Sequence, residues 1–162
     1  AHLTAGSELG NLYSERKRGY IEALRDHNLP IDEELIINLK AVTYKEGVKA
    51  SNKLFDLDPI PDGLFAPGDI IAVSAVQTAK KRGLKVPDDI AVIGFNNDPI
   101  SQIIDPNIST ITHPAEKMGK TAAEIIITSL NSLKKDDAKE ITFLNTEVLV
   151  RESSDRNHNL LI

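Results

Sequence analysis

Residues 86–101 read VPDDIAVIGFNNDPIS and place an acidic turn, an apolar run and a group of amides next to one another. The apolar run at 90–93 is typical of a strand that is buried on both faces, as the strands of parallel sheets are. It leads within a few residues into Asn96, Asn97 and Asp98, whose side chains all form hydrogen bonds. Two interpretations fit this pattern equally well: an Asx turn that only redirects the chain, or the rim of a ligand-binding site.

Strand-like and helix-like segments alternate on both sides of this stretch. Apolar runs predict strands at 1–4, 35–39, 64–66, 89–95, 108–112 and 141–151. Helical periodicity and capping signals predict helices at 13–28, 43–56, 69–82 and 114–133. Because the connections are too long for hairpins, this order predicts an α/β fold in which helices flank both faces of a parallel sheet. A sheet that begins at the first residue leads us to expect a fragment of something larger.

The same patterns predict several local details. Thr43 is expected to cap the helix that follows it. Residues 134–140 are expected to form a solvated turn, and residues 152–162 a loose tail. In the helix at 114–133, the spacing directs one apolar face inward, formed by Met118, Ala122, Ile125, Ile126 and Leu130.

Composition restricts the class of protein. The chain has 162 residues, 41% hydrophobic and 27% charged, which suits one globular domain. No apolar run approaches the ~20 residues that span a bilayer, and AHLTAGSELG at the start lacks the layout of a signal peptide. The absence of cysteine rules out disulfides and thiolate metal sites, and it fits a reducing, cytoplasmic location. A net charge of −5 argues against nucleic-acid binding by this part of the protein.

The loops after the predicted strands carry polar residues that suit a small polar ligand. In open α/β sheets, ligands bind beyond the carboxyl ends of the strands. Besides residues 96–98, these loops contain Arg16, Asp69 and His113. Arg16 is explained as well by a solvated surface charge, and His113 by an ordinary loop position. For Asp69 we expect a cap on the helix at 69–82, worth about 1 kcal/mol, even beside a ligand.

Motifs for catalysis are missing from the sequence. There is no Gly-x-Gly-x-x-Gly after a strand, no phosphate-binding loop with Gly-Lys-Ser/Thr and no His-Glu-x-x-His. The histidines lie far apart in the sequence, so a nucleophile–base pair has little support. We therefore expect no metal site and no cofactor, and a binding module rather than an enzyme.

Four stretches in order carry a family resemblance: SERKRGYIEALRDHNLPID, GLFAPGDIIAVSAVQTAKKRGLKVPDDIAVIGFNND, DPNISTITHPAEKMGKTAAEIII and NTEVLVRESS. Their most specific part is RGLKVPDDIAVIGFNN followed by P-x-I-S-T-I and MG. With these motifs, nearly the whole chain resembles the C-terminal part of the lac-repressor (LacI/GalR) family of bacterial transcription regulators.

The resemblance implies a type I periplasmic-binding-protein-like core that is incomplete, with the second subdomain mostly missing. Residues 1–107 would form the C-terminal subdomain. Residues 108–140 would be a crossover strand and a helix of the N-terminal subdomain, 141–151 a returning strand and 152–162 a tail. A sugar or related polar metabolite would bind between the subdomains and alter operator binding by an N-terminal helix-turn-helix that this chain lacks.

Site residues are implied by the same resemblance. Arg16 in SERKRGY matches the arginine that holds the effector in many members. Asn96 falls where sugar-binding members usually have Asp, and Gly68 replaces the usual Asn before Asp69. Val42 falls where an aromatic ring often stacks on the ligand. Because an ionised Asp only accepts hydrogen bonds whereas Asn also donates, these departures predict an anionic or acceptor-rich effector rather than a neutral sugar.

Partners follow from the resemblance as well. Family members are usually homodimers through this subdomain, and Ile100, Ile103 and Ile104 form a stretch consistent with a partner surface, although core packing explains them equally well. Operator DNA would be contacted only through the missing domain, and no membrane partner is expected. A periplasmic sugar-binding protein of an ABC transporter has the same fold, but GLKVPDDIAVIGF favours the regulator. An α/β enzyme is disfavoured because no catalytic set assembles.

Overall fold

The computed structural model describes residues 1–6, 12–131 and 141–157. Within these residues the strands are β1 (His2–Ala5), β2 (Ile36–Leu39), β3 (Gly63–Phe65), β4 (Ala91–Asn96), β5 (Ser109–Thr112) and β6 (Val148–Leu149). The helices are α1 (Leu12–Asp26), α2 (Tyr44–Phe55), α3 (Asp69–Lys81) and α4 (Ala115–Asn131), with short 3-10 helices η1 (Glu33–Leu35) and η2 (Pro99–Gln102).

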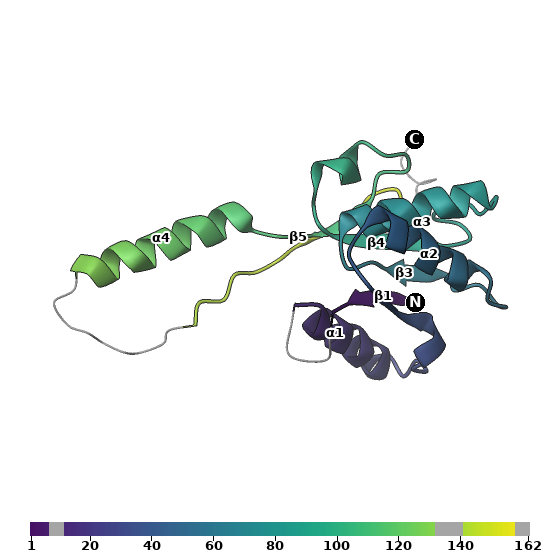
Figure 1. Cartoon of the computed structure of the whole chain (residues 1–162), viewed down its shortest axis with the longest axis horizontal. Helices are drawn as coiled ribbons and strands as arrows, with labels where there is room; N and C mark the ends of the chain where they lie inside the picture. The colour runs from purple at the N-terminus through teal and green to yellow at the C-terminus, as the bar shows by residue number, and fades with distance from the viewer. Residues whose placement is uncertain (7–11, 132–140, 158–162) are drawn as a thin grey trace.

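One mixed sheet organises the described part of the chain. Its six strands lie in the order β2-β1-β3-β4-β5-β6. Strands β1 to β5 run parallel to one another, whereas β6 pairs with β5 in the antiparallel direction. Helix α1 covers one face of the sheet, and α2 and α3 cover the other (Figure 1). The predicted α/β fold, a mostly parallel sheet flanked by helices, is therefore confirmed.

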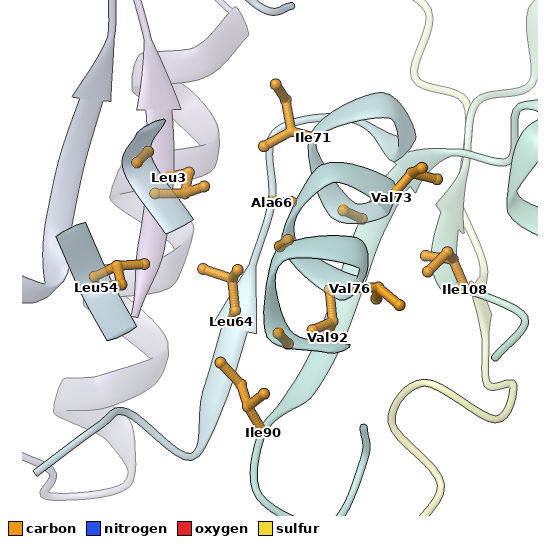
Figure 2. Packing of buried hydrophobic residues seen from close by; sticks show 14 of the residues in the cluster. Leu3, Leu54, Leu64, Ala66, Ile71, Val73, Val76, Ile90, Val92 and Ile108 are labelled. Carbon is orange, nitrogen blue, oxygen red and sulfur yellow. The ribbon is translucent and has the colours of Figure 1, made fainter. Parts of the chain in front are cut away.

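The main core lies between the sheet and the α2–α3 layer. Helix α3 is buried around most of its circumference because it packs against both α2 and β4. Figure 2 shows the side chains that meet in this layer, among them Leu3, Leu54, Leu64, Ile71, Val76, Ile90, Val92 and Ile108. Each of these is at most 2% exposed, and burying an aliphatic side chain of this size contributes about 1.5–3 kcal/mol. The loops at the carboxyl ends of the strands therefore start from a closely packed core.

The two capping predictions have different outcomes. The Thr43 hydroxyl accepts a hydrogen bond from the Glu46 amide at the start of α2, as predicted. The prediction that Asp69 caps α3 is wrong, because the N-cap is Gly68 and no side chain caps this helix. Asp69 is instead the first helical residue, and its carboxylate is directed to other elements.

Helix α4 (Ala115–Asn131) lies within the predicted range of 114–133, but its environment is not the predicted one. None of its residues is buried, and Figure 1 shows it standing apart from the sheet. The prediction of an inward face is therefore wrong for all five of its members: Met118, Ala122, Ile125, Ile126 and Leu130. Periodicity defines an apolar face but does not specify what covers it. None of the helices in the described ranges is long and apolar enough to cross a membrane.

The C-terminal segment corrects two further predictions. The strand predicted at 141–151 is limited to Val148–Leu149. Glu147 still bonds Thr112 at the end of β5, whereas Phe143 is 86% exposed. Residues 152–157 are not a loose tail. Ser153 is fully buried, its amide and carbonyl bond the main chain of Asn107 and Val92, and its hydroxyl donates to the Val92 carbonyl. The turn predicted at 134–140 and residues 158–162 lie outside the described residues.

Candidate functional site

The chain reverses its winding direction between β1 and β3, which places a topological switch point at the carboxyl ends of these strands. Strand β1 leads to α1 on one face, whereas β3 leads to α3 on the other (Figure 1). Such a switch point is where open α/β sheets bind ligands. Arg16 of α1 spans it, because its Nη1 donates a hydrogen bond to the Pro67 carbonyl in the β3–α3 loop. The sheet topology therefore brings Arg16 to the predicted rim.

The Arg16 guanidinium is held in place by aromatic contacts. Its Cζ lies 3.5 Å from the centroid of the Phe95 ring and 5.5 Å from that of Tyr13, both within cation–π range. Burial lowers the pKa of Arg16, but an arginine stays charged at neutral pH. Its Nε is buried without a hydrogen-bond partner, and it forms no ion pair within the described ranges. The rim thus carries a fixed positive charge with unused donor capacity.

Three loops converge beside this arginine. A Cβ added at Gly68 would lie 3.8 Å from the Asn96 Nδ2 and 3.8 Å from the Val42 Cγ1. Gly68 follows β3, Asn96 is the last residue of β4 and Val42 follows β2, so the sheet gathers positions that are far apart in the sequence. Glycine at position 68 leaves the space between the amide and the valine open. Arg16, Val42, Gly68 and Asn96 therefore lie on one rim, as the sequence predicted.

Asn96 and Asn97 form a turn with left-handed backbone geometry. Their φ angles are 105° and 57°, in a region that non-glycine residues rarely adopt, although asparagine tolerates it best. The Asx-turn interpretation is wrong for Asn97. Its side-chain oxygen accepts a hydrogen bond from the Arg151 Nη2 at 2.7 Å, not from an amide two residues further along. The Asn97 side chain is thus bonded to Arg151, a residue outside the turn.

Asp69 stabilises this turn from below. Its Oδ2 accepts from the Asp98 amide at 2.6 Å, and its Oδ1 accepts from the Thr110 hydroxyl at 2.7 Å. The side chain is fully buried, and burial raises the pKa of Asp69 while these two hydrogen bonds lower it. A Cβ at Gly94 would lie 2.2 Å from the Asp69 Oδ1, so glycine is required there for the carboxylate to fit. Asp69 therefore supports the rim, since both of its oxygens are already bonded within the protein.

The remaining predicted residues lie elsewhere. His113 is exposed and lines a cavity of about 480 Å³ with the first turns of α4, including Lys117 and Lys120. It therefore lies with α4, not in the group around Arg16. Ile100 and Ile103 are 38% and 76% exposed, whereas Ile104 is partly buried and packs against the core. Ile100 and Ile103 are thus accessible to a partner chain.

Sequence reasoning missed Phe95, Thr110 and Arg151. Phe95 is the last apolar residue of β4, and its ring faces a cavity of about 420 Å³ that also contacts Arg16 and Ile111. Strand alternation could have placed Phe95 on the face opposite Gly94. No local signal marks Thr110 or Arg151, because their partners lie more than ten residues away along the chain.

Comparisons with known proteins agree on the type of domain. A family model described as a periplasmic binding protein-like domain matches residues 2–154. The NTD biosynthesis operon regulator NtdR of Bacillus subtilis (strain 168) is 36% identical over 157 residues, covering 94% of this chain and 47% of NtdR. The HTH-type transcriptional repressor CytR of Escherichia coli (strain K12) is 31% identical over 150 residues, covering 93% of this chain and 43% of CytR.

A solved structure shows the same arrangement. The complex of the transcriptional regulator CelR with cellobiose aligns with a TM-score of 0.81 at 29% identity, over 94% of this chain and 46% of that chain. The chain thus spans about half the length of the curated relatives it matches.

Proposed function

This chain belongs to the LacI/GalR family of transcriptional regulators, and we propose that it is the effector-sensing part of such a regulator. In this proposal a small polar ligand binds at the rim around Arg16. Its binding alters operator affinity through a DNA-binding segment outside this chain. Residues 1–107 act as one subdomain, residues 108–140 are a crossover strand and a helix of a second one, and residues 141–151 are the returning strand. Catalysis has no part in this function.

One observation carries the proposal: a charged, partly buried arginine at the topological switch point is surrounded by open positions from three other loops. Arg16 is fixed by Phe95 and by the Pro67 carbonyl, so its position is set before a ligand arrives. The Arg16 guanidinium lies at the Pro67 carbonyl, next to Gly68, and the Asn96 amide supplies a hydrogen-bond donor beside the space left by Gly68. Preorganised donors of this kind favour binding because little side-chain entropy is lost.

The charge balance of the rim favours a particular class of effector. Asp69 accepts two internal hydrogen bonds, and no carboxylate in the described residues forms an ion pair with Arg16. A ligand that brings its own acceptors, such as a sugar acid, satisfies the guanidinium and the Asn96 amide together. A neutral sugar leaves the positive charge unbalanced. The effector we propose is therefore anionic or rich in acceptors.

Isothermal titration of the intact protein with galacturonate and with cellobiose tests this proposal. We expect galacturonate to bind more tightly, and Arg16→Met to weaken its binding by about 10- to 100-fold, because hydrogen bonds to a charged group contribute about 1.5–3 kcal/mol. The matched control is Arg18→Met, two residues further along α1, where the arginine is 65% exposed and pairs with Glu15 and Glu22. Equal losses in both variants, or tighter binding of cellobiose, would contradict the proposal.

The regulator we propose acts as a homodimer. Ile100 and Ile103 are exposed on η2 and the residue that follows it, and they present apolar surface beside the rim loop. We expect the intact protein to be a homodimer in sedimentation experiments, with this stretch at its interface.

A further inference from the structure

A groove lies at the amino-terminal edge of the sheet, the edge opposite the rim. The helices α2 and α3 end at this edge, on the side of the sheet away from α4 (Figure 1). The groove has a volume of about 350 Å³ and lies between η1 and the loop at 57–62, which connects α2 to β3. Ile60 is 37% exposed, so a partner can reach its apolar lining. That lining consists of Leu35, Leu57, Pro59, Ile60 and Pro61.

Carboxylates surround this groove. Four acidic side chains complete its lining: Asp32, Glu34, Asp58 and Asp62. All four are exposed, and none of them forms an ion pair within residues 1–6, 12–131 and 141–157. We call the apolar and acidic residues together the acidic groove. A partner that fits it must bring apolar surface and positive charge together.

A basic turn lies on the same edge. Residues 80–85, KKRGLK, form the end of α3 and the turn after it, and they contain four basic side chains but no acidic one. Two of the four pair with aspartates. Lys81 and Lys85 are exposed, and neither forms an ion pair in the part of the chain that the structure describes. Leu84 is only partly buried, so the basic turn combines both properties that the acidic groove requires.

The acidic groove and the basic turn are held next to each other. The Ala91 amide at the start of β4 donates to the Asp62 carbonyl at 2.9 Å. Arg156 bridges the same two loops, because its Nη2 donates to the Asp62 carbonyl at 2.7 Å and its Nε to the Pro87 carbonyl at 3.0 Å. The strands that follow these loops, β3 and β4, are neighbours in the sheet. One edge therefore presents opposite charges in fixed, adjacent positions.

This edge is complementary to itself. A twofold axis between two copies places the acidic groove of each chain opposite the basic turn of the other, and isologous contacts of this kind are the commonest in homo-oligomers. Within one chain the groove and the turn lie side by side, and no ion pair in the described ranges joins them. Opposite charges that meet across an interface guide association and fix its orientation. The charges of both features are thus available to a second copy.

We propose that the amino-terminal edge of the sheet is a self-association surface, at which the acidic groove of one copy binds the basic turn of a second copy. The contact uses residues other than Ile100 and Ile103, which we expect at the homodimer interface. The two contacts together assemble the protein beyond a dimer. This inference goes beyond effector sensing and does not rest on it, because neither the groove nor the turn includes a residue of the rim.

Sedimentation velocity of the intact protein tests the contact through its salt dependence. The Debye length is about 10 Å at about 0.1 M NaCl and falls to about 3 Å at about 1 M. At the lower salt concentration we expect a species larger than the dimer, whose share grows with protein concentration. At the higher salt concentration this species should disappear. A wild-type protein that shows no such species at either salt concentration overturns the proposal.

Charge reversal then tests the two features separately. Glu34→Lys with Asp58→Lys makes the groove basic, and Lys81→Glu with Lys85→Glu makes the turn acidic. Each double variant alone opposes like charges at the contact, so we expect its dissociation constant to rise at least about 10-fold. An equimolar mixture of the two variants opposes unlike charges again in both halves of the contact. We expect this mixture to recover the wild-type dissociation constant to within about threefold.

Lys40→Glu with Lys45→Glu is the matched control. Both lysines are exposed, form no ion pair in the described residues and lie at the opposite edge of the sheet, after β2. This control changes the net charge as much as the variant of the turn does, and it should leave the larger species intact. Equal losses in the control and in the variant of the turn, or a mixture that fails to recover association, overturn the proposal.

Circular dichroism checks that each variant folds. If a reversed variant does not fold, Asp58→Asn or Lys81→Gln replaces it, because these changes remove one charge without adding repulsion. We expect each of them to weaken association in the same direction by a smaller factor, and association as tight as that of the wild type in both contradicts the proposal.

Discussion

Replacing Thr110 by Val tests whether the rim depends on a single buried hydroxyl. The side chain keeps its shape, but the Asn97 amide loses its acceptor and one Asp69 oxygen loses its donor. Thr110 and Asp69 are fully buried, so water cannot replace the lost bonds. Each unsatisfied buried group costs about 1–3 kcal/mol, and we expect a net loss of about 2–4 kcal/mol in the free energy of unfolding.

Circular dichroism during thermal unfolding measures this loss, which corresponds to a fall in Tm of roughly 4–16 °C for a chain of this size. Thr112→Val is the matched control on the same strand. The Thr112 hydroxyl accepts from the Glu147 amide in an exposed hydrogen bond, which water replaces, so we expect a loss of about 0.5 kcal/mol or less. Equal losses in the two variants would refute the argument that burial makes Thr110 essential.

Two further predictions concern the layers below the rim. His2 is fully buried, stacked between Tyr20 and Phe65 with centroid distances of 5.1 and 4.8 Å, and burial lowers its pKa from 6.5 to about 4. Because the unfolded chain takes up the proton first, stability should fall by up to about 3 kcal/mol as the pH drops from 6.5 towards 4. His2→Phe should flatten this pH dependence of the unfolding free energy in urea titrations. An unchanged pH dependence in the variant would contradict its assignment to His2. Gly94→Ala forces a Cβ to 2.2 Å from the Asp69 Oδ1, so we expect a loss of about 1–3 kcal/mol in urea unfolding. Gly63→Ala, where a Cβ meets nothing within 4 Å, should cost less, and the reverse order would contradict the packing argument.

The sequence alone determined the order and type of the elements. The apolar run at 90–93 predicts a buried strand, and β4 is that strand. Thr43 predicts the start of α2 because a cap acts within three residues of itself. The topology of a parallel sheet then places Arg16, Val42, Gly68 and Asn96 at one edge. These features were predictable because the interactions behind them are local or follow from the winding of the chain.

The tertiary structure alone decided what these residues do. Asp69 has the sequence context of a cap, yet its partners are Asp98 and Thr110, 29 and 41 residues further along the chain. Arg151 and Asn97 are separated by 54 residues, and no local pattern relates them. The apolar face of α4 was recognisable, but its exposure was not, since periodicity carries no information about the surface opposite it. Hydrogen-bond partners and burial depend on which distant segments meet, and only the folded chain specifies that.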